Sequence, residues 1–572
     1  MREKVKQKIE AALAAAQAAG AITLEGEAPQ VAIDLPKKPE HGDFATNLAM
    51  LLAKPARKAP RAIAEALVAQ LDPADPLIAS AEIAGPGFIN LRLHPRQWFE
   101  SLGAVFAEGD RYGQSAVGEG KRVCVEFVSA NPTGPMHVGH GRGAVTGDII
   151  STLLDWAGFE VTREYYVNDA GNQIDVLATS VYTRYQQAHG LEVELPEGCY
   201  PGDYVLPCAA ALKERDGDQW LEADEAAWRP VVKAFAIEHM LGLIKEDLAA
   251  FNIRFDVWSS EAALKEAGRI QAGLSALREK GFLLEAENGA TLFKSSEFGD
   301  DKDRAVIKGD GAYTYLAGDV AYHWDKLQRG FDRLVNVWGA DHGGYVPRMA
   351  AAVEALGFPR EALETPLVQM VNLTRNGQPV RMGKRSGEFV TLREVMEEVG
   401  RDATRVFFVQ RRSEAQFDFD LELAKQQSMD NPVFYLQYGH ARMAAILRKA
   451  VAEGHSLPGD TPSEAAYAAL GLPEEIALAR RVDAFPELVA GAAAALEPHR
   501  VVYWLNETLA AFHSYYTKYK NTERVVSDDL AKTEGRLFLV KALKQVVRNG
   551  LHILGVDAPE EMHRDVADDD EA

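Results

Sequence analysis

The stretch Asn131-Pro-Thr-Gly-Pro-Met-His-Val-Gly-His-Gly-Arg-Gly143 decides the fold class of this chain. It follows an apolar segment typical of a strand, Arg122–Val128, and it precedes an apolar-periodic segment that predicts a helix ending near Trp156. The next segment, Glu160–Val167, again has the pattern of a strand. Strand, helix and strand in this order predict a βαβ unit. We therefore expect a parallel sheet with nucleotide chemistry at the strand ends.

The loop between the first strand and the helix is a candidate phosphate site. Backbone N–H groups and the helix dipole favour an anion at such a position, and glycines at 139, 141 and 143 let a nucleotide approach the backbone closely. His137 and His140 share one face of the first helical turn, so both imidazoles are candidate donors to phosphate oxygens. A packed loop and a metal-binding histidine pair are the alternatives. Because no third ligand or adjacent glutamate accompanies the pair, we predict no dedicated metal site.

A second candidate is the basic segment Pro379-Val-Arg-Met-Gly-Lys-Arg-Ser-Gly-Glu-Phe-Val-Thr-Leu392. Lys384 can reach a phosphate as a point charge, and the glycines permit closure over a ligand. Basic surface loops are common, so this segment carries weight only together with the histidine loop.

Length and composition limit the class of protein. The chain has 572 residues, which favours three to four domains at roughly 150 residues each. Its 47% hydrophobic and 26% charged residues are ordinary for a globular protein. A formal net charge of −22 excludes nucleic-acid binding by overall positive charge but leaves local basic patches open. Three cysteines without a CxxC pair oppose a disulfide framework and a structural zinc site.

The sequence gives no sign of secretion or of membrane association. The charged N-terminus lacks the apolar region of a signal peptide, and no apolar stretch approaches ~18 residues. We therefore expect a cytoplasmic enzyme.

Periodicity and turn residues divide the chain into three predicted domains. Residues 1–115 predict a small α+β domain, and residues 116–430 predict an α/β catalytic domain with a polar insertion at about 172–226. Residues 431–572 predict an all-α helical bundle. After the insertion, the strands of the parallel sheet are expected to resume at Phe255–Trp258, Arg304–Ile307 and Leu334–Trp338.

Together, the two loops resemble those of the class I aminoacyl-tRNA synthetases, in which a His-x-Gly-His loop and a Lys-Met-Ser-Lys-Ser-like loop bracket ATP on a Rossmann-type sheet. His137-Val-Gly-His140 matches the first motif, and Arg381-Met-Gly-Lys384-Arg385 is a variant of the second. Arginine replaces the first lysine and glycine the first serine, so only Lys384 carries over as the catalytic lysine. The resemblance implies catalytic roles for His137, His140 and Lys384, with Mg²⁺ arriving with ATP. It also implies that ATP is bound by Gly139, His137, His140, Met382 and Lys384.

Further segments narrow the resemblance to the arginyl-tRNA synthetases over almost the whole chain. These are Val125-Glu-Phe-Val-Ser-Ala-Asn131-Pro-Thr-Gly-Pro, Asn168-Asp-Ala-Gly-Asn172, Tyr313-Thr-Tyr315-Leu-Ala-Gly-Asp319, Trp338-Gly-Ala-Asp341-His342 and Leu554–Met562. The resemblance implies that residues 1–115 contact tRNA and that residues 431–572 bind the anticodon. It implies L-arginine, ATP and tRNA(Arg) as substrates, no DNA partner, and a monomer. It also implies that arginine activation requires bound tRNA.

A guanidinium ion is planar and permanently charged, so a selective site needs carboxylates placed for bidentate bonds. Tyr315 and Asp319 are four residues apart on a predicted helix face, and Glu261 follows a predicted strand. The resemblance implies that Asp319 and Glu261 hold the guanidinium, that Tyr315 packs beside it and that Asn131 holds the α-amino group. Each acid could instead be solvated or paired with Arg or Lys. The full predicted arginine pocket is Ser129, Asn131, Glu261, Tyr315, Asp319 and Asp341.

The reaction implied is activation of L-arginine with ATP to arginyl-adenylate, followed by transfer to the 3′ end of tRNA(Arg). It needs positioning and charge stabilisation rather than a nucleophilic side chain. A nucleotidyltransferase, a non-catalytic tRNA- or protein-binding relative, and a synthetase for another amino acid are the alternatives. The helical domain and the predicted arginine acids oppose the first. The presence of His140 and Lys384 opposes the second. The paired acids and the absence of zinc and editing regions oppose the third.

Overall fold

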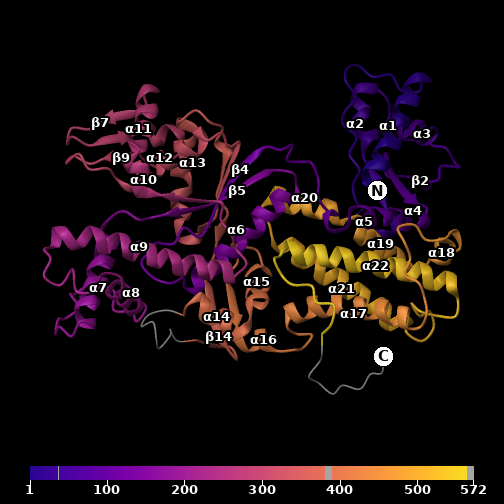
Figure 1. The fold of residues 1–572 in the computed structure, drawn as a ribbon. Coiled ribbons are helices and arrows are strands. Elements are labelled where there is room, and N and C mark those ends of the chain that lie inside the picture. Colours follow the sequence, from indigo (N-terminus) through magenta and orange to yellow (C-terminus); the bar gives the residue numbers. More distant parts are fainter. Residues whose placement is uncertain (37, 381–389, 563–572) are drawn as a thin grey trace. The chain divides into compact units, whose positions relative to one another are not determined.

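The computed structural model describes residues 1–36, 38–380 and 390–562 (Figure 1). They form two compact units. The first consists of Met1–Tyr112, Arg442–Phe485 and Thr508–Val547. The second consists of Gly113–Ala441, Pro486–Glu507 and the described residues from Arg548 onward.

A five-stranded sheet forms the centre of the second unit. Its strands lie in the order β12-β10-β4-β5-β6, and all four neighbouring pairs are parallel. The predicted parallel sheet is therefore confirmed. The strands are β4 (Arg122–Glu126), β5 (Glu160–Val167), β6 (Val257–Ser260), β10 (Arg333–Asn336) and β12 (Leu363–Glu364).

Helix α6 (Val138–Trp156) follows the histidine loop and runs beside β4 and β5 (Figure 1). Most of its residues are buried, and Gly158, at φ +87°, ends the turn into β5. The approach is closest at Gly147, where an added Cβ would lie 2.2 Å from the Phe127 ring. Glycine at position 147 therefore lets the helix pack directly against Phe127, since no side chain would fit between them.

One strand prediction is wrong. Residues Arg304–Ile307 form β9, but this strand belongs to a separate three-stranded antiparallel sheet. Its partner β8 (Thr291–Phe293) ends only a short loop earlier, and β8 also pairs with β7 (Leu283–Glu285). The connection between β8 and β9 is too short for the crossover of about a dozen residues that parallel neighbours need, so β9 pairs antiparallel with β8 and completes the small sheet instead of extending the large one.

Helices cover the sheet and build the insertion. A buried cluster joins α11 (Arg269–Glu279), α12 (Tyr315–Gln328) and α13 (Val346–Ala355) to β4 and β10. The insertion contains α7 (Asn172–Ala188) and α8 (Val205–Asp216), which pack on α9 (Glu225–Ala250) through an apolar core of their own.

A smaller sheet follows in the same unit. It contains β14 (Val371–Arg375), β15 (Gln378–Pro379) and β16 (Phe417–Asp420), and it is accompanied by α14 (Leu392–Val399), α15 (Arg401–Val409) and α16 (Leu421–Lys425).

The N-terminal residues have the expected α+β composition. An antiparallel sheet has the order β1-β3-β2, with a turn at Gly85–Gly87 between the last two strands. Its strands are β1 (Phe44–Thr46), β2 (Ile78–Ala84) and β3 (Phe88–Leu93), and the helices beside it are α1 (Arg2–Ala18), α2 (Leu48–Ala56) and α3 (Pro60–Val68).

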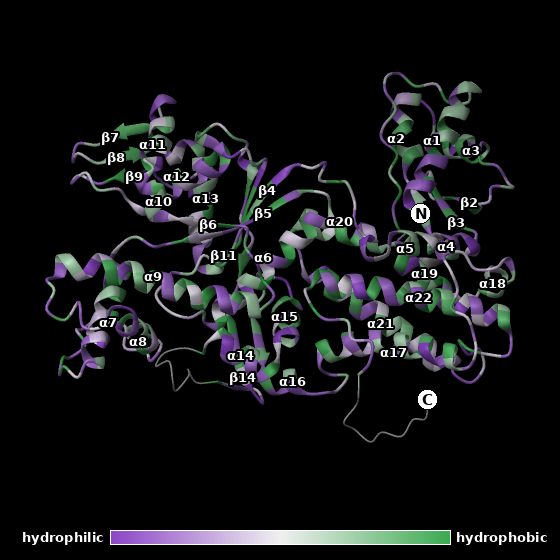
Figure 2. Ribbon diagram, in the orientation of Figure 1, coloured by the Kyte–Doolittle hydropathy of each residue, from purple (hydrophilic) through white to green (hydrophobic). Residues whose placement is uncertain are grey.

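In the described part of the chain after residue 431, all regular secondary structure is helical. The helices are α17 (Pro432–Ala452), α18 (Glu464–Ala469), α19 (Pro473–Asp483), α20 (Phe485–Ala495), α21 (His499–Tyr519) and α22 (Leu530–Ile553). Figure 2 shows hydrophobic and hydrophilic residues interleaved along α9 and α22, as in amphipathic helices. None of the helices in the described ranges has the length and apolarity that a membrane crossing requires. The predicted α/β, α+β and all-α fold classes are confirmed, whereas the boundaries at 115 and 430 stay predictions.

The Gly147→Ala variant should lower the free energy of unfolding by about 1–3 kcal/mol, because the new methyl group would overlap the Phe127 ring. Gly242→Ala is the matched control, since it also lies inside a helix but has nothing within 4 Å of an added Cβ. That change should raise stability by about 0.5–1 kcal/mol. Denaturant unfolding of both variants tests the close packing, and equal stabilities would refute it.

Candidate active site

The histidine loop places two imidazoles at the start of α6. His137 is the N-cap residue, and its main-chain N–H donates to His140 Nδ1 at 3.3 Å. The two rings stack with centroids 3.7 Å apart. A Cβ at Gly139 would lie 2.8 Å from the His137 ring, so glycine is required between them. The start of the helix therefore combines the positive end of the helix dipole with two oriented imidazoles.

Both histidines are neutral at physiological pH. Burial lowers the pKa of His137, and burial together with His137 lowers the pKa of His140 to about 3. Because Nδ1 of His140 accepts a hydrogen bond, the proton of its neutral ring lies on Nε2. His140 can thus stabilise a phosphate oxygen as a hydrogen-bond donor without carrying a charge.

The residues that follow the basic Lys384 segment form hydrogen bonds with the histidine loop. Val138 N donates to Val390 O at 3.1 Å, and Leu392 N donates to Met136 O at 2.8 Å. Thr391 then caps α14. Met382 and Lys384 lie outside the described residues, but the end of their segment is fixed beside the histidine loop.

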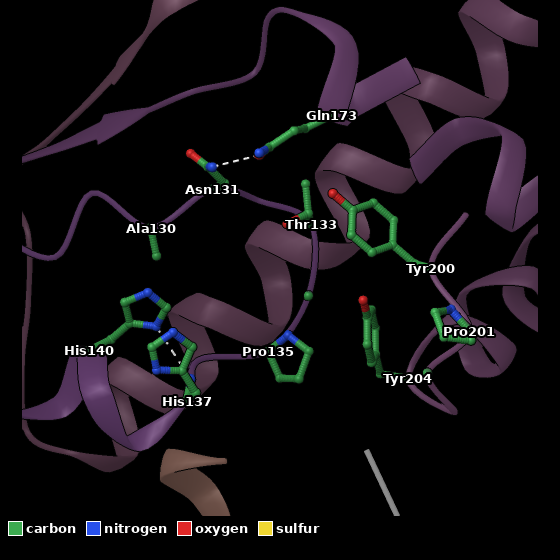
Figure 3. A pocket seen from close by; sticks show the side chains of 12 residues that line it. Ala130, Asn131, Thr133, Pro135, His137, His140, Gln173, Tyr200, Pro201 and Tyr204 are labelled. Carbon is green, nitrogen blue, oxygen red and sulfur yellow. Dashed lines mark hydrogen bonds between the residues drawn. The ribbon is translucent and has the colours of Figure 1, made fainter. Parts of the chain in front are cut away.

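A cavity of about 330 Å³ opens next to the histidines. The histidine loop supplies one wall, and the insertion supplies the other through Gln173, Tyr200 and Tyr204 (Figure 3). Asn131 Nδ2 donates to Gln173 Oε1 at 2.7 Å, which links the two walls. The insertion therefore helps to enclose the site, a role that its sequence did not reveal.

Acidic side chains converge at the carboxyl ends of the neighbouring strands. Burial raises the pKa of Asp319 to about 6, against a hydrogen bond from Tyr345 that lowers it, and the charges of Glu126 and Glu261 raise it further. Glu261 begins α10 (Glu261–Glu266) and pairs with Lys265 at 2.6 Å. The structure thus brings two of the predicted arginine ligands, Asp319 and Glu261, into one electrostatic cluster.

Three members of this cluster were missed from the sequence. Burial, and then the charges of Glu261, Asp319, Glu126 and Asp169, raise the pKa of Tyr166, so its ring lies among these acids. Glu126 and Asp169 fall within the quoted family segments, which is the signal that could have singled them out.

Ser129 lies in a strained turn beside the acids. It has φ +43° and follows Val128 at φ +68°, two consecutive left-handed residues that are not glycine. Its hydroxyl donates to Glu126 Oε1 at 3.0 Å and accepts from the Tyr166 N–H at 3.1 Å. These bonds fix the backbone that leads to Asn131.

The last two predicted ligands face solvent in this structure. Tyr315 is 88% exposed at the first position of α12. The Asp341 side chain is 76% exposed and lies 3.7 Å from His342. Their contact with arginine stays a prediction. Within the described ranges, no three His, Cys, Asp or Glu side chains gather in a way that could hold a metal ion.

Comparison with known families agrees with this geometry. The model "tRNA synthetases class I (R), catalytic domain" matches residues 101–421. The chain belongs to the arginyl-tRNA synthetase family. The family's N-terminal domain model matches residues 3–93, and the DALR anticodon binding domain model matches residues 436–562.

Full-length relatives support the assignment to the arginyl-tRNA synthetases. An arginine–tRNA ligase from Anaeromyxobacter sp. (strain Fw109-5) is 54% identical over 94% of this chain and 95% of its own length. One from Geobacillus kaustophilus is 48% identical over 98% of this chain and 99% of its own length. The arginyl-tRNA synthetase structure from Thermus thermophilus shares the fold, with a TM-score of 0.74 at 23% identity over 98% of this chain and all of that one.

We expect His140→Ala to slow adenylate formation by roughly 10²–10³, because one preorganised donor to phosphate charge is lost. The arginine concentration needed for half-maximal rate should change little. Pyrophosphate exchange in the presence of tRNA measures both quantities. His94→Ala, at an exposed position, is the control, and near-normal exchange by His140→Ala would remove His140 from the phosphate site.

Proposed function

We propose that this chain activates L-arginine with ATP and transfers the arginyl group to the 3′ end of tRNA(Arg). The observation that carries the proposal is the convergence of Asp319, Glu261 and Glu126, because Glu126 ends the strand that leads into the loop of the two neutral histidines. Membership of the arginyl-tRNA synthetase family supports the same reaction.

In the first step, the arginine carboxylate attacks the α-phosphate of ATP, and the bond to the β-phosphate breaks to release pyrophosphate. His137, His140 and the helix N–H groups stabilise the developing phosphate charge. Lys384 is assigned to the phosphates from its motif, and Gly139 and Met382 complete the assigned ATP site. In support, Val390 and Leu392, which follow that motif, bond to the histidine loop. Mg²⁺, which the family resemblance implies would come with ATP rather than from a protein site, would offset part of the phosphate charge.

The amino acid is selected by charge and shape. Asp319 and Glu261 accept hydrogen bonds from the guanidinium, and Asn131 accepts from the α-amino group. Ser129 holds the turn before Asn131, while Tyr315 and Asp341 close the site from the exposed side. A lysine ammonium cannot reproduce the planar fork of arginine.

In the second step, a 3′-terminal ribose hydroxyl of tRNA attacks the arginyl carbonyl, and AMP leaves. Residues 431–572 bind the anticodon, and residues 1–115 contact the tRNA elsewhere. The matches to the DALR and N-terminal domain models support these roles. A monomer stays our expectation from the family resemblance, and a cytoplasmic location stays our expectation from the sequence.

Asp319→Asn should raise the arginine concentration needed for charging by about ten- to a thousandfold. The amide removes the charge and places a donor against N–H groups that can only donate. The requirements for ATP and tRNA should stay near wild type. Asp325→Asn on the same helix is the control, since Asp325 pairs with Arg269 and Arg329. If arginine dependence in Asp319→Asn stays within about threefold, the pocket is wrongly assigned.

Lys384→Ala should slow adenylate formation by roughly 10²–10³ with little change in arginine affinity, because a cation on the transferring phosphate is lost. Single-turnover adenylate formation with tRNA present tests this, with the exposed Lys302 changed to Ala as the control. Normal turnover would exclude Lys384 from the reaction.

A further inference from the structure

Tyr345 forms a hydrogen bond with the acid at the centre of the proposed arginine pocket. Its hydroxyl donates to Asp319 Oδ2 across 26 residues of sequence. Tyr345 ends the 3₁₀ segment Ala340–Tyr345 and is the N-cap residue of α13. The bond therefore joins the first turns of α12 to the start of α13.

The tyrosine ring is held independently of this bond. It packs against Trp338 with centroids 6.0 Å apart, and the guanidinium of Arg348 lies 5.2 Å from its centroid. Arg348 is placed in turn by Asp300 at 3.8 Å. Because these contacts involve the ring, they remain when the hydroxyl is removed.

The direction of the hydrogen bond is fixed by chemistry. Burial and the nearby charge of Asp319 raise the pKa of the Tyr345 phenol, so it stays protonated and donates. An ionised carboxylate offers about four acceptor sites, and Tyr345 occupies one of them on Oδ2. The other oxygen is left for a ligand that carries several N–H donors, as a guanidinium does.

Several other groups act on Asp319. The acids Glu126 and Glu261 disfavour its ionised form, while Lys326 favours it. The ring of His323 bonds to the Asp319 carbonyl at 2.8 Å rather than to its carboxylate. The charge of Asp319 also raises the pKa of Tyr166, on β5. Among the described residues, Tyr345 is the one whose side chain forms a hydrogen bond with the Asp319 carboxylate.

We propose that Tyr345 is a positioning residue for the amino-acid substrate: its hydroxyl fixes the carboxylate of Asp319 in the orientation that receives the guanidinium. The inference rests on the proposed assignment of Asp319 to the arginine pocket. A hydrogen bond to the ionised form lowers a pKa, so Tyr345 also keeps Asp319 charged at neutral pH although burial opposes this.

Tyr345→Phe separates this role from mere packing, because the ring contacts to Trp338 and Arg348 are retained. Without the hydroxyl, the pKa of Asp319 rises above its value of about 6. The fall of arginine kcat/KM on the acid side should therefore begin about one pH unit higher than in the wild type. At pH 7 the arginine KM should rise roughly tenfold, with kcat and the ATP KM within about twofold.

The matched control is Tyr322→Phe. Tyr322 lies on α12 with Asp319 and donates to Glu164 at 2.7 Å, so this variant loses a tyrosine–carboxylate bond of the same kind. Tyr322→Phe should lower the Tm but leave the pH at which arginine kcat/KM begins to fall on the acid side unchanged. Steady-state charging of tRNA by the full-length enzyme with varied arginine, measured from about pH 5.5 to 8.5, gives the arginine KM, the kcat and the pH dependence of kcat/KM.

The outcomes separate the inference from the function on which it rests. A raised arginine KM and a shifted acid limb in Tyr345→Phe alone would support it. An arginine KM within about twofold of wild type, or the same acid-limb shift in Tyr322→Phe, would overturn it while Asp319→Asn still impairs arginine use. If Asp319→Asn itself has no effect on arginine use, Asp319 is not part of the arginine pocket, and the proposed role of Tyr345 is wrong as well.

Discussion

The Lys326 ammonium lies 2.5 Å from the Glu126 carboxylate, with the two side chains only 0% and 9% exposed. Burying two charges is costly, and removing one partner of such a pair typically destabilises a protein by about 3–5 kcal/mol. Glu126 ends β4 directly before the histidine loop. Lys326 lies about two helical turns after Asp319 on α12. The pair thus holds the phosphate-binding side of the site in register with the arginine-binding side.

The pair extends into a polar network that leads to Asp319. Lys326 donates to Asn336 Oδ1 at 3.2 Å, and the amide of Asn336 donates to His323 Nε2 at 2.8 Å. His323 then donates from Nδ1 to the Asp319 carbonyl. Burial lowers the pKa of His323 to about 3, so the ring is neutral and one tautomer satisfies both bonds. A buried network in which each member is paired defines a single geometry.

The sequence predicted the parts of the fold that depend on local pattern. The segments β4, α6 and β5 carry their own periodicity, and each was found within a few residues. The strand at Arg304–Ile307 was also found, but its assignment to the parallel sheet was wrong because apolar character does not encode the partner. The site shows the same limit. The histidine pair follows from residue spacing within one turn, whereas Tyr345 and Tyr166 join the acids only through tertiary contacts.

The proposed reaction requires that arginine is the amino acid these acids select. Pyrophosphate exchange with each of the twenty amino acids, with and without tRNA(Arg), tests this most directly. We expect exchange with arginine alone among the amino acids and, from the family resemblance, only when tRNA is present. Exchange with a different amino acid, or none with arginine in the presence of tRNA, would contradict it.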